Sequence, residues 1–158
     1  MLLGNRSHAA QDSDFVLGLF GRFFFELRLV VVHDVPATST CIRYGGGLAV
    51  DPDGGLLIAS GRGFAVRRVD PITGLITAVV GRRGDCDPAL RGDGGPALAA
   101  CLQTAVAVAS GARGDLFISD PGDDRVRRVD AETGIISTLV QGSPEAPLRP
   151  THLTVSPD

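Results

Sequence analysis

The chain has 158 residues, about the length of one average domain, and a formal net charge of −3. Hydrophobic residues make up 44% and charged residues 21%, so the chain can bury a core and lacks the composition of a disordered protein. The 21 Gly and 10 Pro, with no three-residue Gly period, exclude collagen and favour a turn-rich β fold, while the slightly acidic charge gives no general attraction to nucleic acid or anionic lipid.

Residues 1–44 are predicted to form a separate N-terminal segment. Phe15–Val32 is strongly apolar, but Arg22, Glu26 and Arg28 divide it into pieces shorter than the ~20 residues that a membrane span needs. A single Arg precedes the apolar stretch and no small-x-small site follows it, which is a poor match to a signal peptide. The alternation over Phe25–Val32 is typical of a half-buried strand, interpreted here as the outer strand of a preceding unit.

An internal repeat organises the rest of the chain. Ala65–Asp70 returns as Arg125–Asp130, and Leu56–Ser60 returns as Leu116–Asp120, both at an offset of 60 residues.

The first strand of each unit is aligned with a different offset. Leu48-Ala49-Val50 matches Val106-Ala107-Val108 at an offset of 58, and we expect the turn that follows to absorb the difference. Leu153–Asp158 echoes Leu48–Asp53 and predicts the start of a third, incomplete copy.

Each unit is predicted to hold four antiparallel strands joined by short turns. Gly74 and Gly134 stand where a tight turn requires positive φ, and the Asp and Thr before each can cap the turn. A four-stranded unit that recurs along the chain predicts an all-β fold of β-propeller blades, which bury their faces by stacking. In the first copy the expected strands are Gly47–Val50, Leu56–Ser60, Phe64–Val69 and Leu75–Val80.

Two segments carry a family resemblance. Leu116–Asp130, which reads LFISDPGDDRVRRVD, resembles the NHL repeat, whose blades typically read GNLYIADxxNHRIRRVD. Gly92–Leu102 resembles the GDGGPAxxAxL insert of the long NHL repeats found in bacterial and teneurin-like proteins. The resemblance runs from Gly45 to the C-terminus, and it departs from the family where Asp123-Asp124 replace the usual Asn-His.

The predicted organisation follows from the resemblance. Residues 1–44 precede the repeats, 45–81 form one NHL blade, 82–103 an inter-blade insert, 104–142 a second blade, and 143–158 a linker with the first strand of a third. Within the insert, Pro96 is placed as a first helical residue, and Leu98, Cys101 and Leu102 fall on one face. We therefore expect one short helix that covers the join between blades. Propellers close with ~4–8 blades, so the chain is predicted to be a truncated propeller or to assemble with other copies.

The three cysteines, Cys41, Cys86 and Cys101, are too few for a disulfide scaffold, and none has zinc-site spacing. Cys101 is interpreted as a small buried hydrophobic residue, with a disulfide to Cys86 as the alternative.

The resemblance implies a non-enzymatic module for protein interaction or scaffolding, with an unidentified protein partner and possible self-association through uncovered blades. The loop Ser119–Arg125 is the predicted interaction loop, and its candidate residues are Asp120, Asp123, Asp124 and Arg125.

RNA binding is a second possibility, because some NHL propellers bind RNA through a basic face. Arg67-Arg68 and Arg127-Arg128 each lie inside a predicted strand, so the two side chains of a pair point to opposite faces. Without stacking aromatics or a basic surface, we interpret them as structural ion-pairing residues whose partners are Asp120 or Asp130.

Metal chemistry is the remaining alternative. Asp115, Asp120, Asp123 and Asp124 could suggest calcium, but the Gly and bidentate Glu of a calcium loop are absent. Related propellers include metal-dependent lactonases and a lyase, yet His152 is the only His at a predicted strand entrance. The sequence therefore predicts no catalytic residues, no metal and no cofactor.

Overall fold

The structure is a computed structural model that describes residues 35–42, 45–82, 87 and 89–156. The strand predicted at Phe25–Val32 lies outside the described residues. The described chain is almost entirely β, and it includes no helix long and apolar enough to cross a membrane. Its elements are β1 (Val35–Pro36), η1 (Ala37–Ser39), β2 (Gly45–Val50), β3 (Leu56–Ser60), η2 (Gly61–Gly63), β4 (Ala65–Val69), β5 (Leu75–Val80), η3 (Ala97–Ala99), β6 (Ala107–Ser110), β7 (Leu116–Asp120), β8 (Arg125–Val129) and β9 (Ile136–Gln141).

The strands form two antiparallel sheets, one in the order β1-β5-β4-β3-β2 and the other in the order β6-β7-β8-β9. Tight turns join the strands where the sequence predicts them. Gly74 and Gly134 have φ angles of 68° and 67°, in the left-handed region that glycine adopts without strain. In the same turns Asp70 accepts a hydrogen bond from the N–H of Thr73 at 2.8 Å, and Asp130 accepts one from Thr133 at 2.9 Å.

The two sheets repeat with one offset of 60 residues throughout, so the offset of 58 expected for the first strand is wrong. Leu48 stands opposite Ile58 in the first sheet, and Val108 stands opposite Ile118 in the second. The equivalent of Leu48 is therefore Val108 and not Val106. The expected difference of two residues is absent because the turn after the first strand has the same number of residues in both units.

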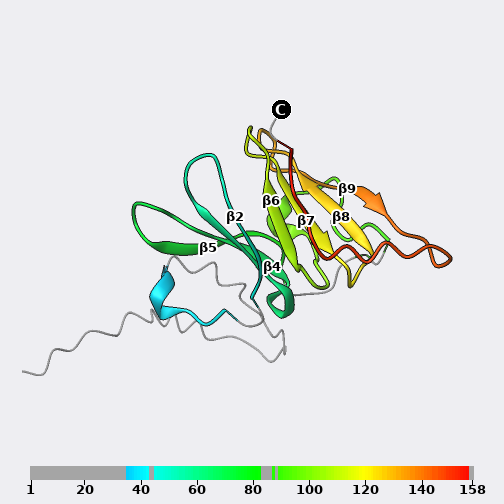
Figure 1. Cartoon of the computed structure of the whole chain (residues 1–158), viewed down its shortest axis with the longest axis horizontal. Helices are drawn as coiled ribbons and strands as arrows, with labels where there is room; N and C mark the ends of the chain where they lie inside the picture. Colours follow the sequence, from blue (N-terminus) through cyan, green and yellow to red (C-terminus); the bar gives the residue numbers. More distant parts are fainter. Residues whose placement is uncertain (1–34, 43–44, 83–86, 88, 157–158) are drawn as a thin grey trace, which may run out of the picture.

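One core lies between the two sheets. Side chains from one face of the first sheet pack with side chains from the second sheet and from the connecting segment 97–105. In Figure 1 the outer strands β5 and β9 lie on opposite sides of the molecule, with β2 and β6 between them. At the centre the N–H of Gly47 donates to the carbonyl of Val106 at 2.7 Å, an approach that glycine permits because it has no Cβ. The core residues are Leu57, Ala59, Val66, Val80, Ala97, Ala100, Leu102, Ala105, Val108, Ile118, Val129 and Ile136.

The helix predicted in the insert is reduced to η3, a single 3₁₀ turn. Pro96 precedes this turn with extended ψ of 136°, and Ala100 after it is extended again, so the chain never continues into an α-helix. Leu98 is consequently 47% exposed, while Leu102 is buried. The insert still joins the two sheets, because the N–H of Gly81 donates to the carbonyl of Ala97 at 2.9 Å.

The insert also extends the second sheet, in a way that the sequence interpretation missed. Pro96 bridges Ile135 at the start of the outermost strand, just as Pro36 in β1 pairs with Leu75. Each proline is followed by a 3₁₀ turn. The two segments are 60 residues apart, so residues 35–41 are the first unit's copy of part of the insert. The shared signal is Pro-Ala followed four residues later by Cys, at 36–41 and at 96–101.

The predicted start of a third copy forms no regular strand in the described residues. This C-terminal segment, drawn in red in Figure 1, runs across the second sheet. The hydroxyl of Ser119 on β7 donates to the carbonyl of Pro150 at 2.9 Å, which holds the segment against the sheet.

Cys101 is buried, as expected, but it is disulfide-bonded, so its interpretation as a free hydrophobic residue is wrong. Cys86, the partner considered in the sequence, lies outside the described residues. Cys41, at the equivalent position of the first unit, is free and exposed.

Candidate functional site

The predicted interaction loop contains a fully buried carboxylate. Asp120 has no exposed surface, and its two oxygens accept hydrogen bonds from the N–H groups of Gln103 and Thr104 at 2.8 and 2.7 Å. Burial raises the pKa of Asp120, and the two N–H donors oppose that rise. Asp120 thus fastens the end of the insert to β7, and it offers no surface to a partner.

Arg125 is also buried, because the insert lies over it. Its guanidinium donates to the carbonyl of Ala89 at 2.8 Å and stands 3.4 Å from the carboxylate of Asp123. Asp123 in turn accepts a hydrogen bond from Arg91 at 3.2 Å. These charges compensate one another between the insert and the loop.

Asp124 completes the loop in a left-handed conformation, with φ of 56°. Its carboxylate accepts a hydrogen bond from the N–H of Arg149 at 2.6 Å. Of the four candidate residues, Asp120 and Arg125 therefore face the interior, while Asp123 and Asp124 are half-buried. Partner binding by the loop stays a prediction.

Arg68, Arg127 and Arg128 form ion pairs, as expected of the strand arginines, but of the two expected partners only Asp130 takes part in these pairs. Arg128 binds Asp115 at 2.9 Å and Asp130 at 3.2 Å. Arg127 has no exposed surface and pairs with Asp93 of the insert instead of Asp120. The Nε and Nη1 atoms of Arg127 are buried without a hydrogen-bond partner.

In the first unit the equivalent of Arg128 is Arg68, which also pairs with an aspartate. That aspartate lies at the opposite end of the turn between the first two strands of the unit. Arg68 binds Asp51 at 2.5 Å, where Asp51 opens the turn that Gly55 closes. In the second unit the turn opens with Gly111 and closes with Asp115, the partner of Arg128.

The hydrogen bond from Arg68 lowers the pKa of Asp51. The N–H of Ala131 and then the side chain of Arg128 lower that of Asp115.

No three His, Cys, Asp or Glu residues gather as a possible metal site in the part of the chain that the structure describes. The carboxylate of Asp115 forms an ion pair with Arg128, and the carboxylate of Asp120 accepts hydrogen bonds from backbone N–H groups. His152 is exposed, with its Nδ1 3.0 Å from the hydroxyl of Thr151.

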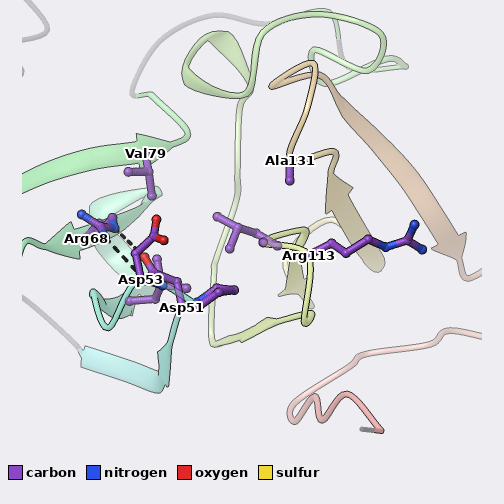
Figure 2. Close-up of a pocket in the computed structure, with 10 residues that line it drawn as sticks. Asp51, Asp53, Arg68, Val79, Arg113 and Ala131 are labelled. Atoms are coloured by element: carbon purple, nitrogen blue, oxygen red, sulfur yellow. Dashed lines mark hydrogen bonds and ion pairs between the residues drawn. The ribbon is translucent and has the colours of Figure 1, made fainter. Parts of the chain in front are cut away.

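An open groove of about 320 Å³ lies between the two sheets, at the end of the sheets opposite to the predicted loop. The turns that begin at Asp51 and at Gly111 form its two rims. Figure 2 shows Asp51, Asp53, Arg68 and Val79 on one wall, facing Arg113 and Ala131 on the other. The half-buried side chains of Val79 and Leu116 contribute apolar lining, and the Arg113 guanidinium is directed away from Asp53.

Comparisons with known proteins assign no family. No protein-family model matches the chain, and no curated protein matches it. Among solved structures, a structural genomics protein of unknown function from Bacteroides thetaiotaomicron VPI-5482 aligns with 48% of this chain and 18% of its own length. The identity is 23% and the TM-score 0.42, which is too distant to carry an argument about function.

Proposed function

We propose that the chain is part of an NHL-type β-propeller and serves as a non-enzymatic protein-interaction module. The 60-residue repeat supports this assignment, because both units have the same antiparallel strand order and stack face to face. The close approach of β2 and β6 also supports it, since neighbouring propeller blades meet along their first strands.

The groove between the sheets is the observation that carries the interaction function. Its half-buried apolar side chains leave surface that a partner can remove from water, and its charged rim can set orientation. The ion pair between Arg68 and Asp51 fixes one rim in advance, which reduces the entropy lost on binding.

Two alanine substitutions test the groove. Ala131 and Ala112 are exposed residues on turns of the same sheet, but only Ala131 lines the groove. Affinity capture with the wild-type chain and quantitative mass spectrometry should identify a specific partner, whose recovery falls at least about tenfold for Ala131→Glu and stays unchanged for Ala112→Glu. Equal loss for both variants, or no specific partner, would overturn the proposal.

Two further assays address the competing functions. Lactonase turnover with added Ca²⁺ or Zn²⁺ above that of a His152→Ala control, or tight, salt-sensitive RNA retention on filters, would contradict a purely protein-binding role.

A further inference from the structure

A group of polar side chains lies buried between the insert and the outer strands of the second sheet, and several of its atoms form no hydrogen bond. Arg125 and Arg127 are two residues apart on β8, so both point to the same face of the sheet, where the insert covers them. Their side chains are 5% and 0% exposed. The Nε and Nη1 atoms of both arginines are buried without a hydrogen-bond partner among the described residues.

Two further atoms of this kind lie beside the guanidinium groups. Thr138 on β9 stands opposite Arg127 in register, and its Oγ1 atom is buried without a partner. The Oδ2 atom of Asp123 is 3.4 Å from Nε of Arg125, but it accepts no hydrogen bond there. Within the part of the chain that the structure describes, all six buried side-chain N and O atoms without a hydrogen bond belong to these four residues. Their concentration in one place indicates a common cause.

The first unit shows that the fold of a unit does not need this polar group. It has Gly63, Ala65 and Ala78 where the second unit has the aspartate, the first arginine and the threonine. The strand pairing is nevertheless the same, including an irregularity directly before Arg67 and before Arg127. Ala65 is buried, so a small apolar side chain is sufficient at that position. Buried donors without partners cost free energy, which a bound ligand would recover.

The charges and the hydrogen-bonding atoms of the group define the ligand that it suits. Three guanidinium groups and three carboxylates meet there, from Arg91, Arg125, Arg127, Asp93, Asp120 and Asp123. Because these charges sum to zero, a ligand of low charge is favoured. The atoms without partners are mainly guanidinium donors, with one carboxylate acceptor. A complementary ligand therefore has several acceptor oxygens and at least one O–H group.

We propose that the second sheet binds one small protonated oxyanion, of the class of inorganic phosphate, between β8 and the insert. Arg125 and Arg127 are about 6.6 Å apart along the strand, so one anion can accept hydrogen bonds from both. The hydroxyl of Thr138 adds a donor, and the O–H of the anion donates to Oδ2 of Asp123. Because the insert covers the arginines, the ligand is a free anion and not a phosphate group attached to a macromolecule.

This assignment predicts a preference among anions of similar shape. Sulfate resembles phosphate in size, but it carries no proton at neutral pH and cannot donate to Asp123. The carboxylate of Asp123 should therefore select phosphate by repelling the unprotonated anion. The site is separate from the groove between the sheets, so either proposal can fail without the other.

Isothermal titration calorimetry on the whole chain, purified without phosphate or sulfate, tests the site. The wild-type chain should bind one phosphate, and it should bind sulfate at least about tenfold more weakly. Arg125→Ala should weaken phosphate binding at least about tenfold, and Thr138→Val, which keeps the side-chain volume, at least about threefold. The control Arg113→Ala removes an exposed arginine from another turn and should leave the affinity unchanged.

Asp123→Asn tests the selectivity separately from the affinity. The amide supplies an N–H donor in place of the carboxylate acceptor, so the preference for phosphate over sulfate should disappear. Urea titrations check that each variant folds, as expected for Arg125→Ala because Ala65 holds the equivalent position of the first unit. A wild-type chain that binds no phosphate, or that binds phosphate and sulfate equally, overturns the proposal. Unchanged phosphate affinity in Thr138→Val contradicts it as well.

Discussion

The Oδ1 atom of Asp120, at the end of β7, accepts a hydrogen bond of 2.7 Å from the backbone N–H of Thr104 in the segment that leads into β6. The other carboxylate oxygen holds Gln103. Asp120→Ala leaves both donors without this acceptor and should lower the free energy of unfolding by about 3 kcal/mol in urea titrations. Asp53→Ala, at an exposed turn position, should change it by less than about 0.5 kcal/mol. Equal effects of the two substitutions would show that the Asp120 contacts add no stability.

The close approach of the two sheets at Gly46 gives a second prediction. A Cβ at this position would overlap the backbone carbonyl of Val106, which cannot move without shifting β6. We expect Gly46→Ala to cost about 2 kcal/mol by overpacking. The matched control is Gly45→Ala, whose Cβ would meet only Ile42 at 4.0 Å. Unchanged thermal midpoints for both variants would argue against this packing of β2 on β6.

The aspartate that pairs with the strand arginine stands at the start of the turn in the first unit and at its end in the second, and we expect that its position can be exchanged. Asp51→Gly removes the acceptor of Arg68 and of the N–H of Gly55, and should cost about 1–2 kcal/mol. Gly55→Asp alone should also destabilise, because its Cβ meets the Arg68 guanidinium. The double variant reproduces the second unit, with glycine first and aspartate last, and should recover part of the loss. A double-mutant cycle in urea measures this coupling, and strictly additive effects would contradict it.

Acid should weaken the protein through Asp51 and Asp115. Their folded pKa values lie below 3.8, so the stability they contribute is present above that pH and is lost as the pH falls through the folded values. The urea midpoint should decrease as the pH is lowered from 6 to 2, and this decrease should be smaller for Asp115→Asn than for the wild type.

The contribution of Asp120 to stability should depend on pH in the opposite direction to that of Asp51 and Asp115. Its pKa is raised in the folded state, so its protonation favours folding and its contribution declines as the pH rises from 3.8 through the folded value. Asp120→Asn should remove this decline from the urea midpoints. A variant whose pH profile parallels that of the wild type would contradict the sign assigned to Asp120.

The disulfide at Cys101 should stabilise the insert. Reduction with a thiol should lower the free energy of unfolding by about 2–4 kcal/mol, and Cys101→Ser should abolish the response to reductant. Cys41→Ser, at the free and exposed position of the first unit, should keep the full response.

The strands and tight turns could be predicted because their determinants are local. A short continuous apolar run between Gly55 and Gly61 marks Leu56–Ser60, and the Asp-x-x-Thr-Gly pattern supplies both the cap and the positive φ at Gly74. The offset of the first strand could not be read in the same way. Val106-Ala107-Val108 resembles Leu48-Ala49-Val50 more closely than the true equivalent does, and only the ladder with β7 settles the register.

Features set by distant contacts were missed or misread. The loop Ser119–Arg125 is predicted to contact a partner, but the insert supplies Ala89 and Arg91, more than 30 residues away, to bury Arg125 and pair with Asp123. The predicted helix depended on the spacing of Leu98 and Leu102. Hydrogen bonds from Gly94 and Ala97 to the second sheet hold that segment extended instead.

The pairing of Pro36 with β5, repeated by Pro96 beside the start of β9, means that each sheet receives its outermost piece from chain that precedes its innermost strand. The segment that precedes each sheet in the chain therefore pairs with the outer edge of that same sheet. A transplanted or deleted unit should therefore be cut ahead of this proline, near residues 34 and 94. A cut at the inner strand would separate the sheet from the piece that shields its outer edge.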